Sequence, residues 1–510
     1  MKSLTEVRRH ALATALLAFT LYANSLVNGF VLDDSFLIVG NPWLEDLSWV
    51  PRLLSSDYWA PAAEAGLYRP LTSLTYALNH AVGGPDPFSY HLTNVLLHAA
   101  NSVLVLLLVR RVTGMPELSL LSALLFASHP IHTEVVAGVT SGRPDLLAAA
   151  FMLLSLVTYA VTRRTPRDRA LLPAASLLFF ALALVSKESA IVLPILIPLV
   201  GHMNRRDEGV LPKRLGSLLA DTVPYFAVAL VYLTVRWRVL ESATFVPIAS
   251  FLDNPLVELE PGWRLLSAVY VGLRYLWLLI FPLNLAYDYS FDQIPPLATL
   301  GDPRTLLVAV TSLVGPALVF VLFRRSRIAA FAISFSFVTF CVVANVIVPI
   351  GTIMGERLLY VPSIGFVVLV AGALVAAGRN MGGRFGRRAL PVLCLLLLGC
   401  YSTRSVIRNA DWRSEEALFL HDVATSPRSA KVQANAGAVR LRREQPELAV
   451  HHYTAAINTG IRPDQYPMPY FGYVRSLLLL GRVDEARRLY ERLLPYGFRD
   501  PVVDRQLSPR

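Results

Sequence analysis

The sequence predicts an all-α fold of about eleven membrane-spanning helices, followed by a small C-terminal helical domain. Three observations lead to this prediction. Of 510 residues, 54% are apolar and only 16% are charged, with a mean hydropathy of +0.50. The apolar residues gather in runs long enough to cross a hydrocarbon core. After Arg404 the composition changes to that of a soluble helical segment.

The first apolar run, residues 12–28, follows a basic N-terminus and therefore resembles a secretory signal peptide. We interpret it as a retained signal anchor, because no convincing small-residue cleavage site follows Ala23 before the polar loop. The remaining predicted spans are 92–109, 118–132, 145–162, 170–186, 189–203, 217–237, 303–322, 329–349, 358–378 and 389–403. Cys341, Cys394 and Cys400 all lie in apolar runs, so neither a disulfide framework nor a thiol metal site is expected.

The net charge of +11 is concentrated in short loops, which indicates membrane topology rather than nucleic-acid binding. Basic loops mark the cytoplasmic side, and alternating sides through the predicted spans places all of these loops there. The segment 264–283 would break this alternation if it crossed, and it carries Arg264 and Arg274. We therefore expect a re-entrant or interfacial helix at 264–283. The basic segments are the N-terminus, 110–111, 163–169, 205–214, 324–327 and 379–388.

The predicted topology leaves outer loop 1 (31–90) and the C-terminal tail outside the cytoplasm. We divide the chain into a membrane domain (1–404) and a tail domain (405–510). In the tail, Ala449 and Tyr453 recur 37 residues later as Ala486 and Tyr490, as in tetratricopeptide repeats. Two to three repeats are expected, with an ordinary helical hairpin as the alternative. Either would offer a docking surface for an extended peptide or a partner domain.

Asp33 and Asp34 lie side by side where the first apolar run ends. Adjacent carboxylates at a membrane surface repel each other and resist desolvation, which indicates a functional site. A solvated loop that ends a helix is the plainer interpretation. The residues alone do not separate the roles of the two acids.

Basic residues flank apolar runs on the same predicted side of the membrane. A carboxylate can take the proton of a hydroxyl while such cations neutralise a departing phosphate, so this set suits transfer from a phosphate ester. Each cation has an alternative as a snorkelling side chain or as the partner of a local acid, such as Glu188 or Glu356. The predicted donor phosphate-binding residues are Arg69, Arg143, Lys187 and Arg357.

Histidines form a second polar group on the predicted outer side. His129 and His132 with Glu134 would suit a divalent metal. We favour hydrogen bonding to a substrate or to the loop backbone, because arginines can neutralise a phosphate without a metal; metal is the alternative. His91, Asn94, His98 and Asn101 recur at helical spacing and either line a cavity or tie helices together. The predicted substrate cavity contains His91, Asn94, His129, His132, Glu134, Glu188 and Glu356.

Several motifs in order resemble the transmembrane and tetratricopeptide-repeat protein O-mannosyltransferases of the GT-C superfamily. They are Val31-Leu32-Asp33-Asp34, Tyr68-Arg69-Pro70-Leu71, Tyr90-His91-Leu92-Thr93-Asn94, the run 129–134, Gly142-Arg143-Pro144-Asp145, Ser186-Lys187-Glu188, and the segments 276–290, 355–366 and 408–419. The repeat array is shorter than in eukaryotic members, which leaves acceptor choice open. Pro144 replaces a small residue that is common in the family, which leaves the shape of that turn open.

The resemblance implies a GT-C fold and an inverting transfer of mannose from a polyprenyl-phosphate donor to serine or threonine hydroxyls of exported proteins. It aligns Asp33 with the base and Asp34 with its supporting neighbour. The short tail and the Ala-, Arg- and Leu-rich composition suggest a bacterial inner-membrane protein whose site faces away from the cytoplasm. Expected partners are the lipid-linked sugar, membrane lipids and a protein acceptor, which the repeats would dock. No separate cofactor is expected.

Other classes of function fit the sequence less well. A GT-C transferase that modifies a lipid or a glycan is the closest rival. A transporter would show internal repeats and acids at mid-membrane depth, and neither pattern is visible. A repeat-based scaffold would need one anchoring span rather than eleven.

Overall fold

The computed structural model describes residues 2–161, 166–204, 219–241, 250–380 and 383–507. Within these ranges the regular secondary structure is helical and no β-strand occurs, which confirms the all-α prediction. The longer helices of the first half are α1 (Lys2–Tyr22), α3 (Pro70–Gly83), α4 (Pro87–Thr113), α5 (Pro116–Ser128), α7 (Val139–Ala160), α8 (Pro166–Leu184), α9 (Leu193–Asn204) and α11 (Val223–Leu240). They are followed by α12 (Pro261–Ile280), α13 (Pro303–Arg325), α14 (Arg327–Cys341), α15 (Ser363–Asn380) and α16 (Gly383–Asp411).

Each predicted span overlaps an apolar helix, but residues 342–349 of the predicted span 329–349 are not helical, because α14 ends at Cys341. By length and composition, 8 helices in the described ranges can cross a membrane, or 9 if the bent pair 116–128 and 130–137 counts as one span. Three further apolar helices, at 172–184, 188–203 and 327–341, are shorter. Helix α12 is long enough to cross, so the interfacial or re-entrant placement of 264–283 stays a prediction.

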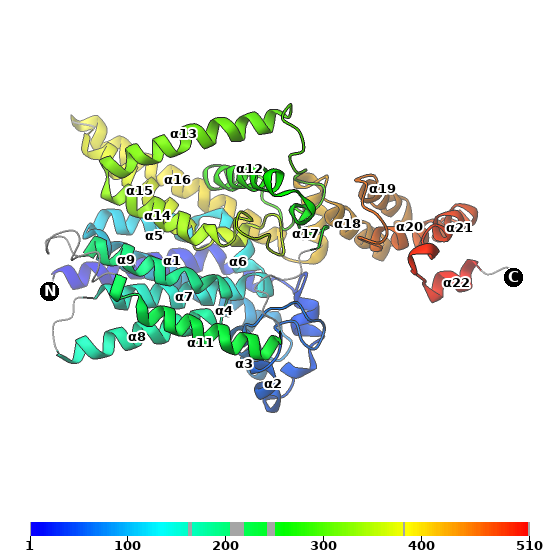
Figure 1. The fold of residues 1–510 in the computed structure, drawn as a ribbon, viewed down its shortest axis with the longest axis horizontal. Coiled ribbons are helices and arrows are strands. Elements are labelled where there is room, and N and C mark those ends of the chain that lie inside the picture. The colour runs from blue at the N-terminus through cyan, green and yellow to red at the C-terminus, as the bar shows by residue number, and fades with distance from the viewer. Residues whose placement is uncertain (1, 162–165, 205–218, 242–249, 381–382, 508–510) are drawn as a thin grey trace.

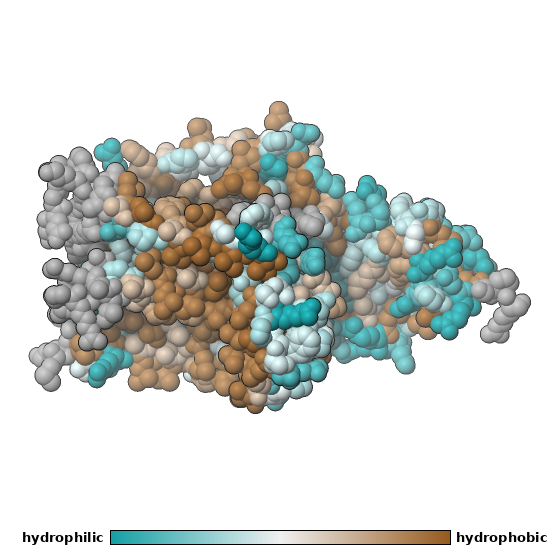
Figure 2. Space-filling view, turned by 60° about the horizontal axis from the view of Figure 1, so that its bottom comes forward, coloured by the Kyte–Doolittle hydropathy of each residue, from teal (hydrophilic) through white to brown (hydrophobic). Residues whose placement is uncertain are grey.

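The apolar helices lie side by side in one bundle, and the tail helices project from one of its ends (Figure 1). Hydrophobic surface covers the visible face of the bundle and gives way to hydrophilic surface over the tail (Figure 2). This distribution is expected of a bundle embedded in lipid with a tail in water. The chain is an integral membrane protein.

Several ion pairs gather basic segments at the end of the bundle that carries the N-terminus (Figure 1). Arg110 pairs with Glu6 at 3.3 Å, and Arg379 pairs with Glu117 at 3.9 Å. The tail domain lies at the opposite end (Figure 1). This arrangement agrees with basic loops that share one side of the membrane.

The tail contains α17 (Glu415–Thr425), α18 (Ala430–Arg442), α19 (Pro446–Ile457), α20 (Met468–Leu479), α21 (Val483–Glu491) and α22 (Pro501–Leu507). The Tyr453 ring lies against Gly437 and Gly472, where an added Cβ would come within 2.8 and 2.1 Å of it. Glycine at these positions lets α18 and α20 approach the helix between them. Consecutive helices pack in the order expected of repeats, and the repeat assignment itself stays a prediction.

Residues 286–293, here termed the clasp segment, attach the tail to the membrane bundle. The Tyr287 amide donates to Asp422 Oδ2 at 2.5 Å, and Ala430 N donates to the Phe291 carbonyl at 2.7 Å. Ser429 Oγ donates to Asp288 Oδ2 at 2.6 Å. Because backbone and side-chain bonds both cross this junction, the clasp segment fixes the tail in place.

Candidate functional site

The acid pair lies in a tight turn between the short helices η1 (Ala23–Val27) and η2 (Ser35–Val39). Leu32 has φ +55°, a left-handed conformation that costs a branched residue free energy and occurs at functional sites. The preceding residues are tied to the end of α16, because Gly29 N donates to the Arg413 carbonyl at 2.9 Å. The turn is thus held by the first residues of the tail domain.

Asp34 is locked into the protein. Its side chain is 1% exposed and accepts three hydrogen bonds, from Val31 N at 3.0 Å, Thr140 N at 2.8 Å and Thr140 Oγ1 at 2.6 Å. Burial raises the pKa of Asp34 to about 6, and the bonds from Thr140 and Val31 oppose this shift. A carboxylate with this many fixed donors is suited to holding a turn.

Asp33 has no such anchors. Its side chain is exposed, and none of the residues that the structure describes donates a hydrogen bond to it. Protein surrounds the carboxyl group on most sides, and the resulting loss of hydration raises the pKa of Asp33. Arg357 and Lys431 oppose that shift, while the charge of Asp253 adds to it. An open carboxylate with a raised pKa has the properties of a general base.

Among the four predicted phosphate-binding cations, Arg357 best fits that role. Its backbone amide donates to Glu134 Oε2 at 2.8 Å, and its Nη1 donates to Glu134 Oε1. The side chain is 32% exposed, whereas Glu134 is buried. A guanidinium has five N–H donors, so Arg357 retains donors for a ligand while it remains paired.

Arg69 and Lys187 lie in ion pairs from neighbouring segments. Arg69 makes a two-bond fork with Glu188, at 2.9 and 2.6 Å, although the two residues lie far apart in the sequence. Lys187 Nζ lies 2.6 Å from both carboxylate oxygens of Asp145. Both cations are therefore neutralised by protein carboxylates, and a phosphate would compete with those partners.

Arg143 lies inside the protein rather than at its surface. The residue is 0% exposed and donates to Asn94 Oδ1, Thr75 Oγ1, Asn79 Oδ1 and the Tyr90 carbonyl. The structure also places residues 139–145 in the first turns of α7 rather than in a loop. Gly142 permits this start, because a Cβ there would lie 1.7 Å from the Val135 carbonyl oxygen.

The histidines and the polar stripe lie inside the bundle. His129 Nε2 lies 3.0 Å from the Leu279 carbonyl, and His132 Nε2 lies 2.9 Å from Ser363 Oγ. His91 Nε2 lies 3.4 Å from the Gly29 carbonyl, just before the acid turn. In the described ranges no group of three or more His, Cys, Asp or Glu side chains is arranged to hold a metal ion. In this structure these rings connect helices.

Glu356 precedes Arg357 and faces the clasp segment. Its Oε1 accepts from Ala286 N at 2.6 Å and from Tyr289 Oη at 2.7 Å, while its Oε2 has no partner in the described structure. Burial raises the pKa of Glu356 to about 8. Glu356 is therefore mainly protonated at neutral pH and connects the clasp segment to the segment that carries Arg357.

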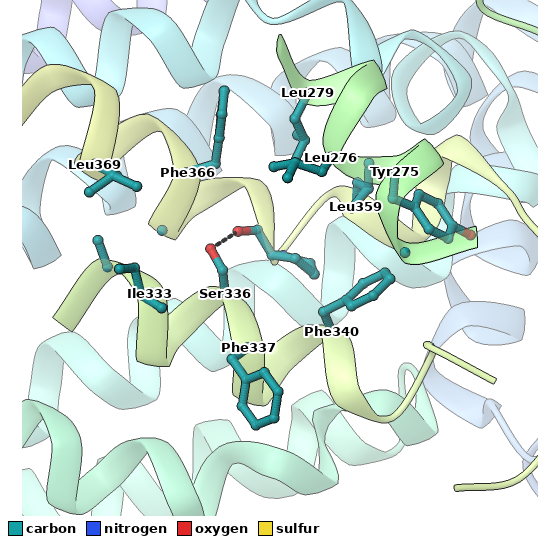
Figure 3. A pocket seen from close by; sticks show the side chains of 14 residues that line it. Tyr275, Leu276, Leu279, Ile333, Ser336, Phe337, Phe340, Leu359, Phe366 and Leu369 are labelled. Atoms are coloured by element: carbon teal, nitrogen blue, oxygen red, sulfur yellow. Dashed lines mark hydrogen bonds between the residues drawn. The ribbon is translucent and has the colours of Figure 1, made fainter. Parts of the chain in front are cut away.

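An apolar pocket of about 260 Å³ lies between α12, α14 and α15 (Figure 3). Leu276 and Leu279 of α12 and Phe366 of α15 line one side of it, and Ile333 and Phe337 of α14 line the other (Figure 3). Leu359, two residues after Arg357, also lines the pocket. Gly355 N donates to Tyr275 Oη at 2.8 Å, so the pocket reaches the segment that carries Arg357.

Sequence reasoning missed four residues of this region. Thr140 binds Asp34, and the Tyr58 ring lies 5.2 Å from the Arg69 guanidinium. Lys431 and Asp253 pair at 2.5 Å and act on Asp33. Thr140 lies two residues before the Gly142–Asp145 motif, which was a usable signal. The other three stand in segments that no motif marked.

Two family models match the chain. The model described as "Protein O-mannosyl-transferase TMTC, DUF1736" matches residues 244–315, and "Dolichyl-phosphate-mannose-protein mannosyltransferase" matches residues 68–235. Protein O-mannosyl-transferase TMTC3 of Mus musculus is 30% identical over 496 residues, which cover 92% of this chain and 53% of the relative. TMTC4 of Homo sapiens is 30% identical over 484 residues, which cover 86% of this chain and 64% of the relative. The chain thus spans about half to two thirds of the length of these relatives.

Solved structures give a weaker match. ArnT from Cupriavidus metallidurans bound to undecaprenyl phosphate aligns over 97% of this chain and 84% of its own, with 14% identity and a TM-score of 0.45. The Archaeoglobus fulgidus oligosaccharyltransferase in its apo form aligns over 83% of this chain and 59% of its own, with 12% identity and a TM-score of 0.43.

Proposed function

We propose that the chain belongs to the transmembrane and tetratricopeptide-repeat protein O-mannosyltransferase family and is an inverting protein O-mannosyltransferase. The donor is a polyprenyl-phosphate mannose, and the acceptors are serine and threonine hydroxyls of exported proteins. One observation carries the proposal: Asp33 is an exposed carboxylate that accepts no side-chain hydrogen bond from the described residues, and the partly exposed Arg357 stabilises its charge.

We assign the base to Asp33 and the supporting role to Asp34. The hydroxyl oxygen attacks the anomeric carbon while Asp33 takes the hydroxyl proton, and the bond from that carbon to the phosphate oxygen breaks. Attack opposite the leaving group inverts the anomeric configuration. Asp34 holds the turn through Thr140, so its carboxylate orients Asp33 and does not meet the substrate.

We assign the donor phosphate to Arg357, with Arg69 and Lys187 as the outer cations of the same charged region. Arg357 neutralises charge on the leaving phosphate through donors that Glu134 does not use. The apolar pocket holds the isoprenoid chain, since its lining is apolar and includes Leu359, two residues after Arg357. Arg143 acts as a positioning residue, because its donors bind α3 and α4.

We propose that the tail domain docks the acceptor polypeptide. A groove of about 620 Å³ lies between α18, α20 and the segment before α22. Arg442, Arg475 and Arg499 line this groove with one acid, Asp500, and with the rings of Tyr453 and Phe471. The excess of positive charge favours acidic stretches of an unfolded acceptor.

We place the protein in a bacterial inner membrane, with the site and the tail facing away from the cytoplasm. The composition supports the bacterial source, and the basic segments at the end opposite the tail support the orientation. A cysteine introduced in the tail should react with an impermeant thiol reagent in intact spheroplasts. Protection until the membrane is permeabilised would reverse the orientation.

The function is tested by comparing exported glycoproteins from cells that carry the native chain, Asp33→Asn or the control Glu45→Gln. Glu45 is an exposed acid of the same outer loop. Loss of a hexose from serine and threonine peptides only with Asp33→Asn would support the proposal. Unchanged peptides with an altered lipid or glycan pool would move the acceptor to the rival transferase. An unchanged profile of both pools would remove Asp33 from catalysis.

A further inference from the structure

The tail domain packs against the turn that carries Asp33, because Val31 and Leu32 share a hydrophobic cluster with Phe419 and Val432 of the tail. Lys431 directly precedes Val432. Lys431 is the second residue of α18, and its Nζ lies 2.5 Å from Asp253 Oδ1 in the loop before α12. Both side chains are about one third exposed, at 32% and 34%, so the pair lies at the protein surface rather than in the core. Asp253 Oδ2 accepts from Ser250 Oγ at 2.6 Å.

The position of this pair is determined by the membrane bundle. Ile353 N donates to the Asp253 carbonyl at 2.9 Å, which ties the loop to the segment that leads to Arg357. Phe291 N donates to the Leu252 carbonyl at 3.0 Å, which ties the same loop to the clasp segment. Three separate segments therefore meet beside Lys431.

We propose that Lys431 is a positioning residue for the transfer step and that the tail domain forms a fixed wall of the site of Asp33. This inference rests on the proposed function. It differs from acceptor docking, because it makes the tail necessary for the chemistry on any acceptor, however short.

Five groups act on Asp33 or respond to its charge. Arg357 and Lys431 favour its ionised form, and Asp253 disfavours it. Asp34 and Tyr58 respond to the charge of Asp33 from the turn and from outer loop 1. Lys431 is the member of this set that the tail supplies. Its removal leaves Arg357 as the one cation that opposes protonation of Asp33 among the described groups.

The test is the pH profile of kcat/KM with a short peptide acceptor in lipid nanodiscs. The acid limb reports the pKa of the base in the free enzyme. Lys431→Met should move that limb to higher pH by about 0.5 to 1 unit, because a partly screened positive charge is lost. Lys431→Arg should retain the native limb. Asp253→Asn should move the limb to lower pH, since it removes a negative charge.

A merely structural role predicts a different pattern. Arg428→Met breaks another ion pair at the same junction, with Asp292, and Arg428 is not among the charges that act on Asp33. The acid limb of the kcat/KM profile of this control should therefore lie at the same pH as in the native protein. Equal shifts in Arg428→Met and Lys431→Met, or shifts of the same sign in Lys431→Met and Asp253→Asn, would overturn the inference.

A second readout does not require turnover. Carbodiimides label protonated carboxyl groups, so mass spectrometry of the peptide that contains Asp33 gives the pH of half-maximal labelling. That pH should rise in Lys431→Met and fall in Asp253→Asn. An unchanged labelling pH would refute the role of Lys431 even if transfer is measurable. The expected labelling shifts without Asp33-dependent transfer would refute the proposed function and the positioning role, and leave only the electrostatic coupling.

Discussion

Thr140→Val tests whether Asp34 holds the acid turn through its ionised carboxylate. The substitution keeps the shape of a buried side chain and removes the hydroxyl that lies 2.6 Å from Asp34 Oδ1. A hydrogen bond to a charged group contributes about 1.5–3 kcal/mol, so we expect the variant to lose about that much stability at pH 8.

The pH dependence follows from the pKa of Asp34, which burial raises to about 6. The Thr140 hydroxyl bond favours the ionised form, so the variant should have a still higher Asp34 pKa. At pH 8 the native carboxyl is ionised and the lost bond costs the most. At pH 5 it is protonated in both proteins, and the difference in unfolding free energy should fall below about 1 kcal/mol.

The direction in which the stability of the native chain changes with pH can be checked in the same experiment. A carboxyl with a raised folded-state pKa contributes stability that is fully present below its unfolded value, near 3.8, and is lost as pH rises through about 6. The assay is reversible unfolding in mixed micelles at pH 5 and pH 8, with kcat measured in parallel. Because the turn carries Asp33, kcat should also fall in Thr140→Val.

Thr72→Val is the matched control. Thr72 is fully buried, and its hydroxyl donates to the neutral Ser186 carbonyl at 3.0 Å. That loss should cost about 1 kcal/mol at both pH values. A cost for Thr140→Val that does not change between pH 5 and pH 8 would refute the reasoning about Asp34.

Two further predictions concern the substrates. Leu369→Trp places a larger ring in the apolar pocket and should raise the KM for a full-length polyprenyl donor, with little change for a donor that carries a short chain; an equal effect on both donors would place the chain elsewhere. Arg442→Glu combined with Arg499→Glu should raise the KM for long acidic acceptors in a peptide-transfer assay and leave short neutral peptides unaffected, because the change reverses charge in the tail groove. Arg488→Glu, an exposed change outside that groove, serves as its control.

Much of the architecture could be predicted because lipid imposes a strong rule on sequence. A helix that crosses lipid must be apolar for most of its length, so long apolar runs in the sequence indicate the spans. Basic loops indicate which side of the membrane each loop faces. The acid pair was visible for a related reason, since charge beside an apolar run is costly. The rule is less decisive for the shorter apolar helices at 172–184, 188–203 and 327–341, whose length alone does not make them membrane spans.

The sequence did not reveal most of the ion-pair and hydrogen-bond partners of the charged residues. Neither local acid pairs with its neighbouring cation, because Lys187 pairs with Asp145 rather than with Glu188, and Arg357 pairs with Glu134 rather than with Glu356. Arg143 flanks an apolar run as a phosphate ligand would, and yet it is enclosed by neutral groups from α3 and α4. Spacing along the chain carries no information about such contacts, which depend on how the helices pack.

The ties between the first membrane helix and the start of the tail domain bear on how the protein is assembled. Asn409 Nδ2 donates to the Leu21 carbonyl at 2.9 Å, and Asn24 Nδ2 donates to the Val406 carbonyl at 2.9 Å. Since a ribosome delivers residue 21 long before residue 409, the acid turn stays unanchored during most of translation. Competence would then arise only after the last membrane helix is inserted, so a truncated or half-inserted chain should not consume lipid-linked sugar.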